Sequence, residues 1–282
     1  MPATALDLLP PPAPWIMGVL NVTPDSFSDG GRHLAAEAAI AQARQMLADG
    51  AHCLDIGGEA TSPGTQPLDA AEELARIEPI VAALAGEAVL SIDTYHAATA
   101  ARCLGLGARI VNDVSALRAD PAMADAVREH DAVLVMMHAK DGPLPHASDR
   151  PRLYGDVVRE IGDFLEERVG HALARGIAAE RLVLDPGWGR FVSLEPDHTF
   201  ELLRRFDELV ARFRPVPLLV GTSRKGFLGV PAADRDPVSQ LTALSAVARG
   251  ASFVRTHAPR MMRQFLDLAA KAGLTPASPP AP

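Results

Sequence analysis

The feature that most constrains the fold is a unit of three parts, first met over Trp15–Gly31 and the residues after it. An apolar run of strand length ends at Asn21, and a polar loop containing Thr23-Pro24 and Gly30-Gly31 separates it from a helical pattern of small and apolar residues. The unit therefore predicts a strand, a loop and a helix, with a polar side chain where the strand ends.

The same unit recurs along the chain. A glycine ends a helical pattern just before an apolar run at Gly50, Gly107 and Gly250. Helices are expected over 34–47, 70–84, 97–104, 121–128 and 157–173. The expected strands are 15–21, 51–56, 88–92, 109–111, 132–137, 181–184, 216–220 and 252–254.

About eight strands thus alternate with about eight helices, with no obvious linker between domains. Near-continuous apolar strands in such alternation are typical of a parallel sheet, and eight units predict an α/β fold, a single (β/α)8 TIM barrel. A doubly wound sheet, the competing fold, usually has a GxGxxG first turn, which is absent.

The chain divides into a barrel and two tails. The barrel is expected over 15–274, with a flexible N-terminal segment over 1–14 and a disordered Pro-rich tail over 275–282. Cys53 and Cys103 lie in apolar surroundings without a CxxC pattern, so they are interpreted as core residues.

The composition excludes several classes of partner. The net charge of −8 argues against a nucleic-acid partner, because phosphate backbones require clustered Lys and Arg. The chain starts without a basic n-region, and no apolar run reaches the roughly 18 residues that cross a membrane. A cytoplasmic protein without a membrane partner is expected.

Polar residues end nearly every predicted strand, and the barrel fold would gather them at one mouth. Their charges are sorted along the chain. Acids and amides follow the first six strands, namely Asn21, Asp55, Asp93, Asn112, Asp113 and Asp185, and the last two strands are followed by Ser223, Arg224, Lys225, Arg255 and His257.

Barrels commonly bind phosphate after strands seven and eight. The expected substrate therefore has an anionic phosphate end and a polar ring end. The histidines form no HxH or HExxH pattern, which argues against a zinc hydrolase. Mg²⁺ shared by Asn21 and substrate phosphates fits better, because Mg²⁺ takes few protein ligands and keeps its waters.

At this point the sequence resembles the dihydropteroate synthase family over nearly its whole length. The matching motifs are Gly18–Gly31, Asp55–Glu59, Ser91–Thr94, Val111–Val114, Met137-His138, Leu184–Gly187, Thr222–Lys225 and Arg255–His257. The resemblance implies a transferase of folate biosynthesis, which joins 6-hydroxymethyl-7,8-dihydropterin diphosphate to 4-aminobenzoate and releases pyrophosphate. It also implies Mg²⁺ and a homodimer.

The resemblance further implies roles for individual residues. The catalytic residues would be Asp93, Lys225 and Asp29. The pterin would be bound by Asp93, Asn112, Met137, Asp185, Gly221 and Lys225. The pyrophosphate would be bound by Asn21, Ser62, Arg255 and His257, with Asn21 also holding Mg²⁺. The aminobenzoate would be bound by Phe27, Thr61, Pro63, Arg190, Phe191 and Ser223.

Three departures from the family pattern stand out. Ser62 replaces the usual pyrophosphate-side arginine, Trp188–Val192 replaces Phe-Gly-Phe-Gly-Lys in a segment about two residues longer, and Arg255–Ala258 replaces Arg-Val-His-Asp. The second and third resemble sulfonamide-insensitive synthases. We therefore hypothesise that Arg190-Phe191 weakens sulfonamide binding more than aminobenzoate binding.

Two other functions remain open from the sequence. A pterin-binding paralogue without synthase activity would explain Ser62 and the altered segment after Asp185. A barrel methyltransferase acting on a folate methyl group would share the pterin-holding residues, but a methyl donor has no pyrophosphate for Arg255 and His257 to hold.

Overall fold

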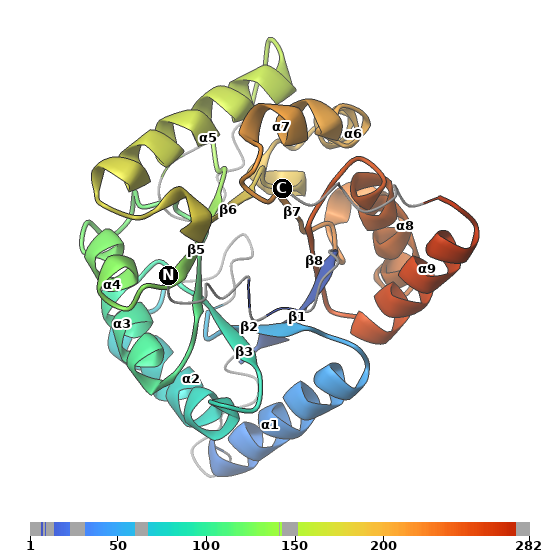
Figure 1. Ribbon diagram of the computed structural model, residues 1–282. Helices are drawn as coiled ribbons and strands as arrows, with labels where there is room; N and C mark the ends of the chain where they lie inside the picture. The colour runs from blue at the N-terminus through green and yellow to red at the C-terminus, as the bar shows by residue number, and fades with distance from the viewer. Residues whose placement is uncertain are drawn as a thin grey trace.

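The computed structural model describes residues 7, 9, 14–22, 32–59, 67–140, 142 and 152–274, and only the backbone of 32–34. The described part contains eight parallel strands ringed by helices (Figure 1). The strands are β1 (Trp15–Asn21), β2 (Cys53–Gly57), β3 (Val89–Asp93), β4 (Ile110–Asp113), β5 (Val133–Met137), β6 (Leu182–Asp185), β7 (Leu219–Val220) and β8 (Phe253–Thr256).

The helices lie outside the strands, as Figure 1 shows. They are α1 (Arg32–Ala48), α2 (Ala70–Leu84), α3 (Ala97–Leu106), α4 (Met123–Glu129), α5 (Val157–Ala174), α6 (Pro196–Arg204), α7 (Phe206–Phe213), α8 (Arg235–Val247) and α9 (Pro259–Lys271). The predicted (β/α)8 barrel is confirmed. Between β6 and β7 the described chain has two helices, because Arg205 leaves helical geometry at φ −111° and ψ 22°. No helix in the described ranges is long and apolar enough to cross a membrane.

Neighbouring strands pair in the order β6-β5-β4-β3-β2-β1-β8-β7. In the described chain the ring closes between β6 and the residues just before β7 through a single bridge, Leu184 to Leu218, with the Leu184 amide donating to Pro217 O at 3.0 Å. The strand expected over 216–220 is shortened to Leu219–Val220, because Pro217 has no N–H to donate to a neighbouring strand.

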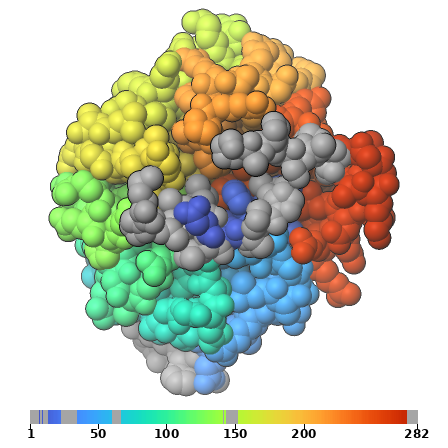
Figure 2. Space-filling model, in the orientation of Figure 1, coloured from blue at the N-terminus to red at the C-terminus, as the bar shows by residue number. Residues whose placement is uncertain are grey.

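The barrel interior is filled by its own apolar cluster. This cluster includes Met17, Cys53, Val183 and Phe253 from four strands, together with Leu9, which is 3% exposed. On the face of the molecule that Figure 2 shows, the described part of the N-terminal segment lies at the centre, with helices around it. The flexibility predicted for 1–14 stays a prediction, since only residues 7, 9 and 14 are described. The tail over 275–282 lies outside the described residues.

Other predicted features of the chain are also present. Both cysteines are free and buried, Cys53 inside the barrel and Cys103 on α3 against the helix layer. Gly107 ends α3 at φ 118°, and Gly50 and Gly250 also have positive φ, a conformation that costs glycine little. The helix ends are thus set by the glycines that the sequence pattern singled out.

Candidate active site

Asp55 is the centre of the polar cluster inside the mouth, although sequence reasoning assigned it no binding role. It is completely buried and accepts hydrogen bonds from Ser91 Oγ at 2.6 Å, Asn112 Nδ2 at 3.0 Å and Arg255 Nε at 2.6 Å. Three other strands therefore meet at one carboxylate of β2. The available signal was a charged residue in the middle of the apolar run Cys53–Ile56.

Arg255 also binds Asp93, with Nη2 donating to Asp93 Oδ2 at 2.6 Å. Burial raises the pKa of Asp93 to about 7, because the loss of water outweighs the opposing charge of Arg255. The carboxylates of Asp55 and Glu73 act in the same direction as burial. Asp93 therefore titrates near neutral pH.

Asn112 lies beside this pair on β4. Its Nδ2 donates to Asp55 Oδ2, which fixes the orientation of the amide. Because that bond uses an N–H, the carbonyl oxygen of the amide faces elsewhere and is available to accept from a ring N–H. This arrangement suits the predicted role of Asn112 toward a pterin.

Asp185 both shapes its turn and contributes an acid to the mouth. Its Oδ1 accepts from the Gly187 amide at 2.8 Å, and burial raises its pKa to about 6 against the effects of that bond and of Lys225. Gly187 has φ 77°, and an added Cβ would lie 2.4 Å from His138 O. The tight turn therefore requires glycine at this position.

Asp113, also expected at the mouth, is held in a structural role. Its two carboxylate oxygens accept from the amides of Ser115 at 2.8 Å and Leu117 at 2.7 Å. These bonds stabilise a turn in which Ala116 and Leu117 have positive φ. Its carboxylate is thus engaged by the loop after β4.

Lys225 carries the cationic charge opposite the acids. Burial lowers its pKa to about 8, with Arg255 adding to the shift and Asp185 and Asp93 opposing it. Its Nζ lies 4.8 Å from the centroid of the Phe191 ring, within the range of a cation–π contact. The structure therefore brings together two residues that were predicted for different substrates.

His257 and Ser223 form a second polar group at the mouth. Ser223 Oγ lies 2.9 Å from His257 Nδ1 and accepts from the His257 amide at 3.1 Å. Burial, together with Arg255 and Arg224, lowers the pKa of His257 to about 4, so the ring is neutral at pH 7. Arg224 itself is paired with Asp236 at 2.7 and 2.8 Å.

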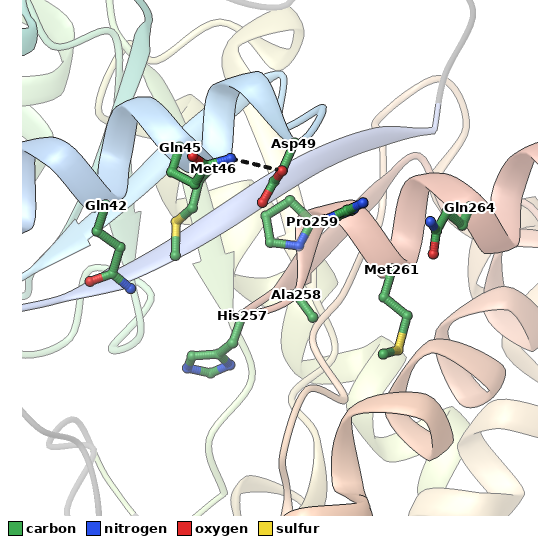
Figure 3. Close-up of a pocket in the computed structure, with 10 residues that line it drawn as sticks. Gln42, Gln45, Met46, Asp49, His257, Ala258, Pro259, Met261 and Gln264 are labelled. Atoms are coloured by element: carbon green, nitrogen blue, oxygen red, sulfur yellow. Dashed lines mark hydrogen bonds between the residues drawn. The ribbon is translucent and has the colours of Figure 1, made fainter.

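His257 also borders a groove between α1 and α9, with a volume of about 440 Å³. Figure 3 shows Gln42 and Met46 on one side of it and Met261 on the other.

In the described chain no three His, Cys, Asp or Glu side chains come close enough to hold a metal ion.

The remaining predicted residues are placed at the rim or fall outside the described chain. Asn21 is exposed at the end of β1, and Gly221 is buried directly after β7. Met137 packs with Tyr95, Val114 and Ala139 in what we term the rim cluster, against which Phe191 also packs. Arg190 is exposed next to Phe191. Outside the described residues lie Phe27, Asp29, Thr61, Ser62 and Pro63.

Fold and site together define a pterin-binding barrel enzyme. A family model described as "Pterin binding enzyme" matches residues 17–257. Among curated proteins, the type-2 dihydropteroate synthase of Escherichia coli is 40% identical over 90% of this chain and 94% of its own length. The dihydropteroate synthase of Mycobacterium leprae is 44% identical over 86% of this chain and 87% of its own length.

Solved structures agree with the sequence relatives. The Xanthomonas albilineans dihydropteroate synthase, solved with 4-aminobenzoic acid, has a TM-score of 0.83 and 35% identity, and covers 94% of each chain. The same enzyme with 7,8-dihydropteroate has a TM-score of 0.80, covering 94% of this chain and 95% of its own. The chain belongs to the dihydropteroate synthase family.

Proposed function

We propose that the protein condenses 6-hydroxymethyl-7,8-dihydropterin diphosphate with 4-aminobenzoate, giving 7,8-dihydropteroate and pyrophosphate. The observation that carries the proposal is the joint placement of Asp93, Asn112, Asp185 and Lys225 beside Arg255 and His257 at one mouth. One half suits a polar heterocycle and the other suits a diphosphate. A relative of the same family binds 4-aminobenzoic acid and 7,8-dihydropteroate in its solved structures.

The chemistry requires a bond from the aminobenzoate nitrogen to the pterin methylene carbon, while the bond from that carbon to the diphosphate oxygen breaks. The attacking nitrogen loses a proton to solvent, and the diphosphate leaves with the bonding electron pair. Positive charge develops on the pterin as the diphosphate departs, and the carboxylates of Asp93 and Asp185 stabilise it. The amine is the nucleophile, so no protein nucleophile is needed.

The diphosphate end is assigned to Arg255 and His257. Nε and Nη2 of Arg255 donate to Asp55 and Asp93, whereas Nη1 has no hydrogen bond to any described residue. Nη1 is therefore the nitrogen assigned to the diphosphate. His257 is neutral at pH 7 and contributes a hydrogen bond rather than charge. Ser223, bonded to His257, connects the diphosphate end to the predicted aminobenzoate carboxylate site.

Mg²⁺ fits the described part of this mouth through Asn21. The Asn21 side chain is exposed at the end of β1, and its amide oxygen is a hard ligand of the kind that Mg²⁺ accepts alongside waters and phosphates. A bound Mg²⁺ would neutralise part of the diphosphate charge as it leaves. Asp29, Phe27, Thr61, Ser62 and Pro63 keep their proposed roles from the family resemblance alone.

Pyrophosphate release by the purified protein tests the proposal. The assay contains the pterin diphosphate and Mg²⁺, with and without 4-aminobenzoate, beside an Asp93→Asn variant. Release that depends on aminobenzoate and collapses in the variant is the expected result. Tight pterin binding without release would instead establish the non-catalytic pterin-binding paralogue.

A further inference from the structure

The segment after β6 carries Phe191 into the site, and its path is fixed by residues from another loop. Phe191 ends a short 3-10 turn, Gly189–Phe191, and packs against the rim cluster with Lys225 Nζ 4.8 Å from its ring. Within its own turn, the amides of Val192 and Ser193 both donate to Gly189 O at 2.9 Å. These bonds close the turn but leave the carbonyls of Arg190 and Val192 to other donors.

Both carbonyls flanking Phe191 are held by the segment that leads into α5. Arg152 Nη1 donates to Arg190 O, and Tyr154 Oη donates to Val192 O at 2.8 Å. A third bond runs the other way, from Ser193 Oγ to Arg152 O at 3.4 Å. The peptide before Phe191 and the peptide after Val192 are thus fixed from one direction.

The donors are themselves well anchored. Arg152 is 4% exposed, so its guanidinium has little freedom to leave the carbonyl. The Tyr154 ring lies under the Lys140 ammonium at 3.7 Å and edge-on to His198 at 5.3 Å. Lys140 also bonds Leu153 O and lies 3.5 Å from Glu160 on α5. This arrangement ties the start of α5 to the loop after β6.

We propose that Arg152 and Tyr154 are positioning residues that hold Phe191 against Lys225 and thereby set the affinity for the aminobenzoate. The inference rests on the proposed synthase function for its kinetic readout. Neither side chain is proposed to touch a substrate. Both act through backbone carbonyls on a ring that shields the Lys225 amine and forms one wall of the aminobenzoate site.

The test uses Tyr154→Phe, which keeps the ring and its contact with Lys140 and removes only the hydroxyl. Loss of one such hydrogen bond corresponds to about a three- to tenfold change in a binding constant. We expect the KM for 4-aminobenzoate to rise by that factor while kcat and the KM for the pterin diphosphate stay within about twofold. Arg152→Lys should give the same pattern, and Ser245→Ala, which removes an α8 hydroxyl that accepts from Arg249, should change nothing.

A double-mutant cycle shows whether Tyr154 acts through Phe191. In Phe191→Ala, the added Tyr154→Phe change should leave the KM for aminobenzoate where it already is. Additive effects of the two substitutions, or an unchanged KM in Tyr154→Phe, would overturn the inference.

Labelling of the Lys225 amine tests the contact without turnover. At about pH 10, two units above the Lys225 pKa of about 8, the amine is neutral and its acylation by acetic anhydride reports shielding. We expect at least about threefold faster labelling of the Lys225 peptide in Tyr154→Phe, read by mass spectrometry against Ser245→Ala. Equal labelling would overturn the inference even if wild-type turnover, and with it the proposed function, had failed.

Discussion

Lys225 lies among two carboxylates and a guanidinium, and its charge is therefore sensitive to pH in the working range. Since its pKa is lowered to about 8, it loses its proton on the alkaline side of neutrality. The pKa values of Asp185 and Asp93 are raised to about 6 and about 7, so these carboxyl groups lose their protons only as the pH approaches neutrality from the acid side. The profile of kcat/KM for the pterin diphosphate should therefore rise through pH 6 to 7 and fall above about 8.

The Lys225→Arg variant assigns the alkaline limb. A guanidinium stays protonated to beyond about pH 12, so the fall above pH 8 should disappear in the variant, whatever its absolute rate. The acid limb should stay where it is, because Asp93 and Asp185 are unchanged. An alkaline limb at the same pH in both proteins would show that another group is responsible.

His138 predicts a pH dependence of stability. Burial lowers its pKa to about 3, with Arg118 and Arg152 adding to the shift, and its Nδ1 has no partner in the described chain. Between pH 6.5 and 3 the unfolded chain therefore binds a proton that the folded chain does not. As the pH falls through that window, this group lowers the free energy of unfolding by up to about 1.4 kcal/mol per pH unit.

The raised pKa values of Asp93 and Asp185 increase the free energy of unfolding as the pH falls over part of the same window. The contribution of His138 is therefore measured as a difference between wild type and a variant. In His138→Phe, the free energy of unfolding relative to wild type should increase steadily as the pH falls from 7 to 4. Urea titrations at several pH values measure it. A difference that is the same at every pH would contradict the prediction.

At the scale of single elements, α2 packs so closely on the end of β2 that one glycine limits the distance. A Cβ on Gly58 would lie 3.0 Å from Glu73 O and 3.2 Å from Ile77 Cγ2. Gly58→Ala should lower the free energy of unfolding by about 1 to 3 kcal/mol through overpacking. Denaturant titration measures the change.

Gly170 offers the matched control within α5. An added Cβ there would meet nothing within 4 Å, so Gly170→Ala should raise the free energy of unfolding by about 0.5 to 1 kcal/mol through helix propensity. Equal effects of the two substitutions would argue against close packing of α2 as the cause.

Element order and most element bounds could be predicted because they depend on local pattern. Glycines at helix ends and apolar runs between them are read directly from the chain. The two-residue length of β7 depends instead on which strand lies beside Pro217, which has no N–H to donate, and the break at Arg205 depends on its ion pair with Asp156, 49 residues away. Neither is a local property.

The members of the site could be predicted, but their division of labour could not. Strand-end position places Asp113 and Asp185 alike, yet the loop after β4 engages Asp113 with two amides, whereas Asp185 gives one oxygen to its turn. Asp55 received no role because its three donors lie 36, 57 and 200 residues away in the sequence. Which polar residues meet is set by the register across the barrel.

At the scale of the whole molecule, the exposed surface of α8 and α9 carries two leucines that a second copy of the chain would shield from water. Leu241 on α8 is 61% exposed and Leu268 on α9 is 64% exposed. If the homodimer proposed from the family resemblance uses this surface, Leu241→Glu with Leu268→Glu should convert a dimer into a monomer. Sedimentation velocity measures the mass, and a dimer that persists would place the interface elsewhere.

The two bonds of Arg255 to Asp55 and Asp93 have a consequence for how the chain is made. The partners are 200 and 162 residues apart, and the cation is the last of the three to be synthesised. At about 5 to 20 residues per second, the ribosome delivers Arg255 roughly 8 to 30 seconds after Asp93. Until then the nascent barrel holds these carboxylates without their guanidinium, and burying them is unfavourable. The mouth of the barrel therefore reaches its final form only when the end of the chain arrives.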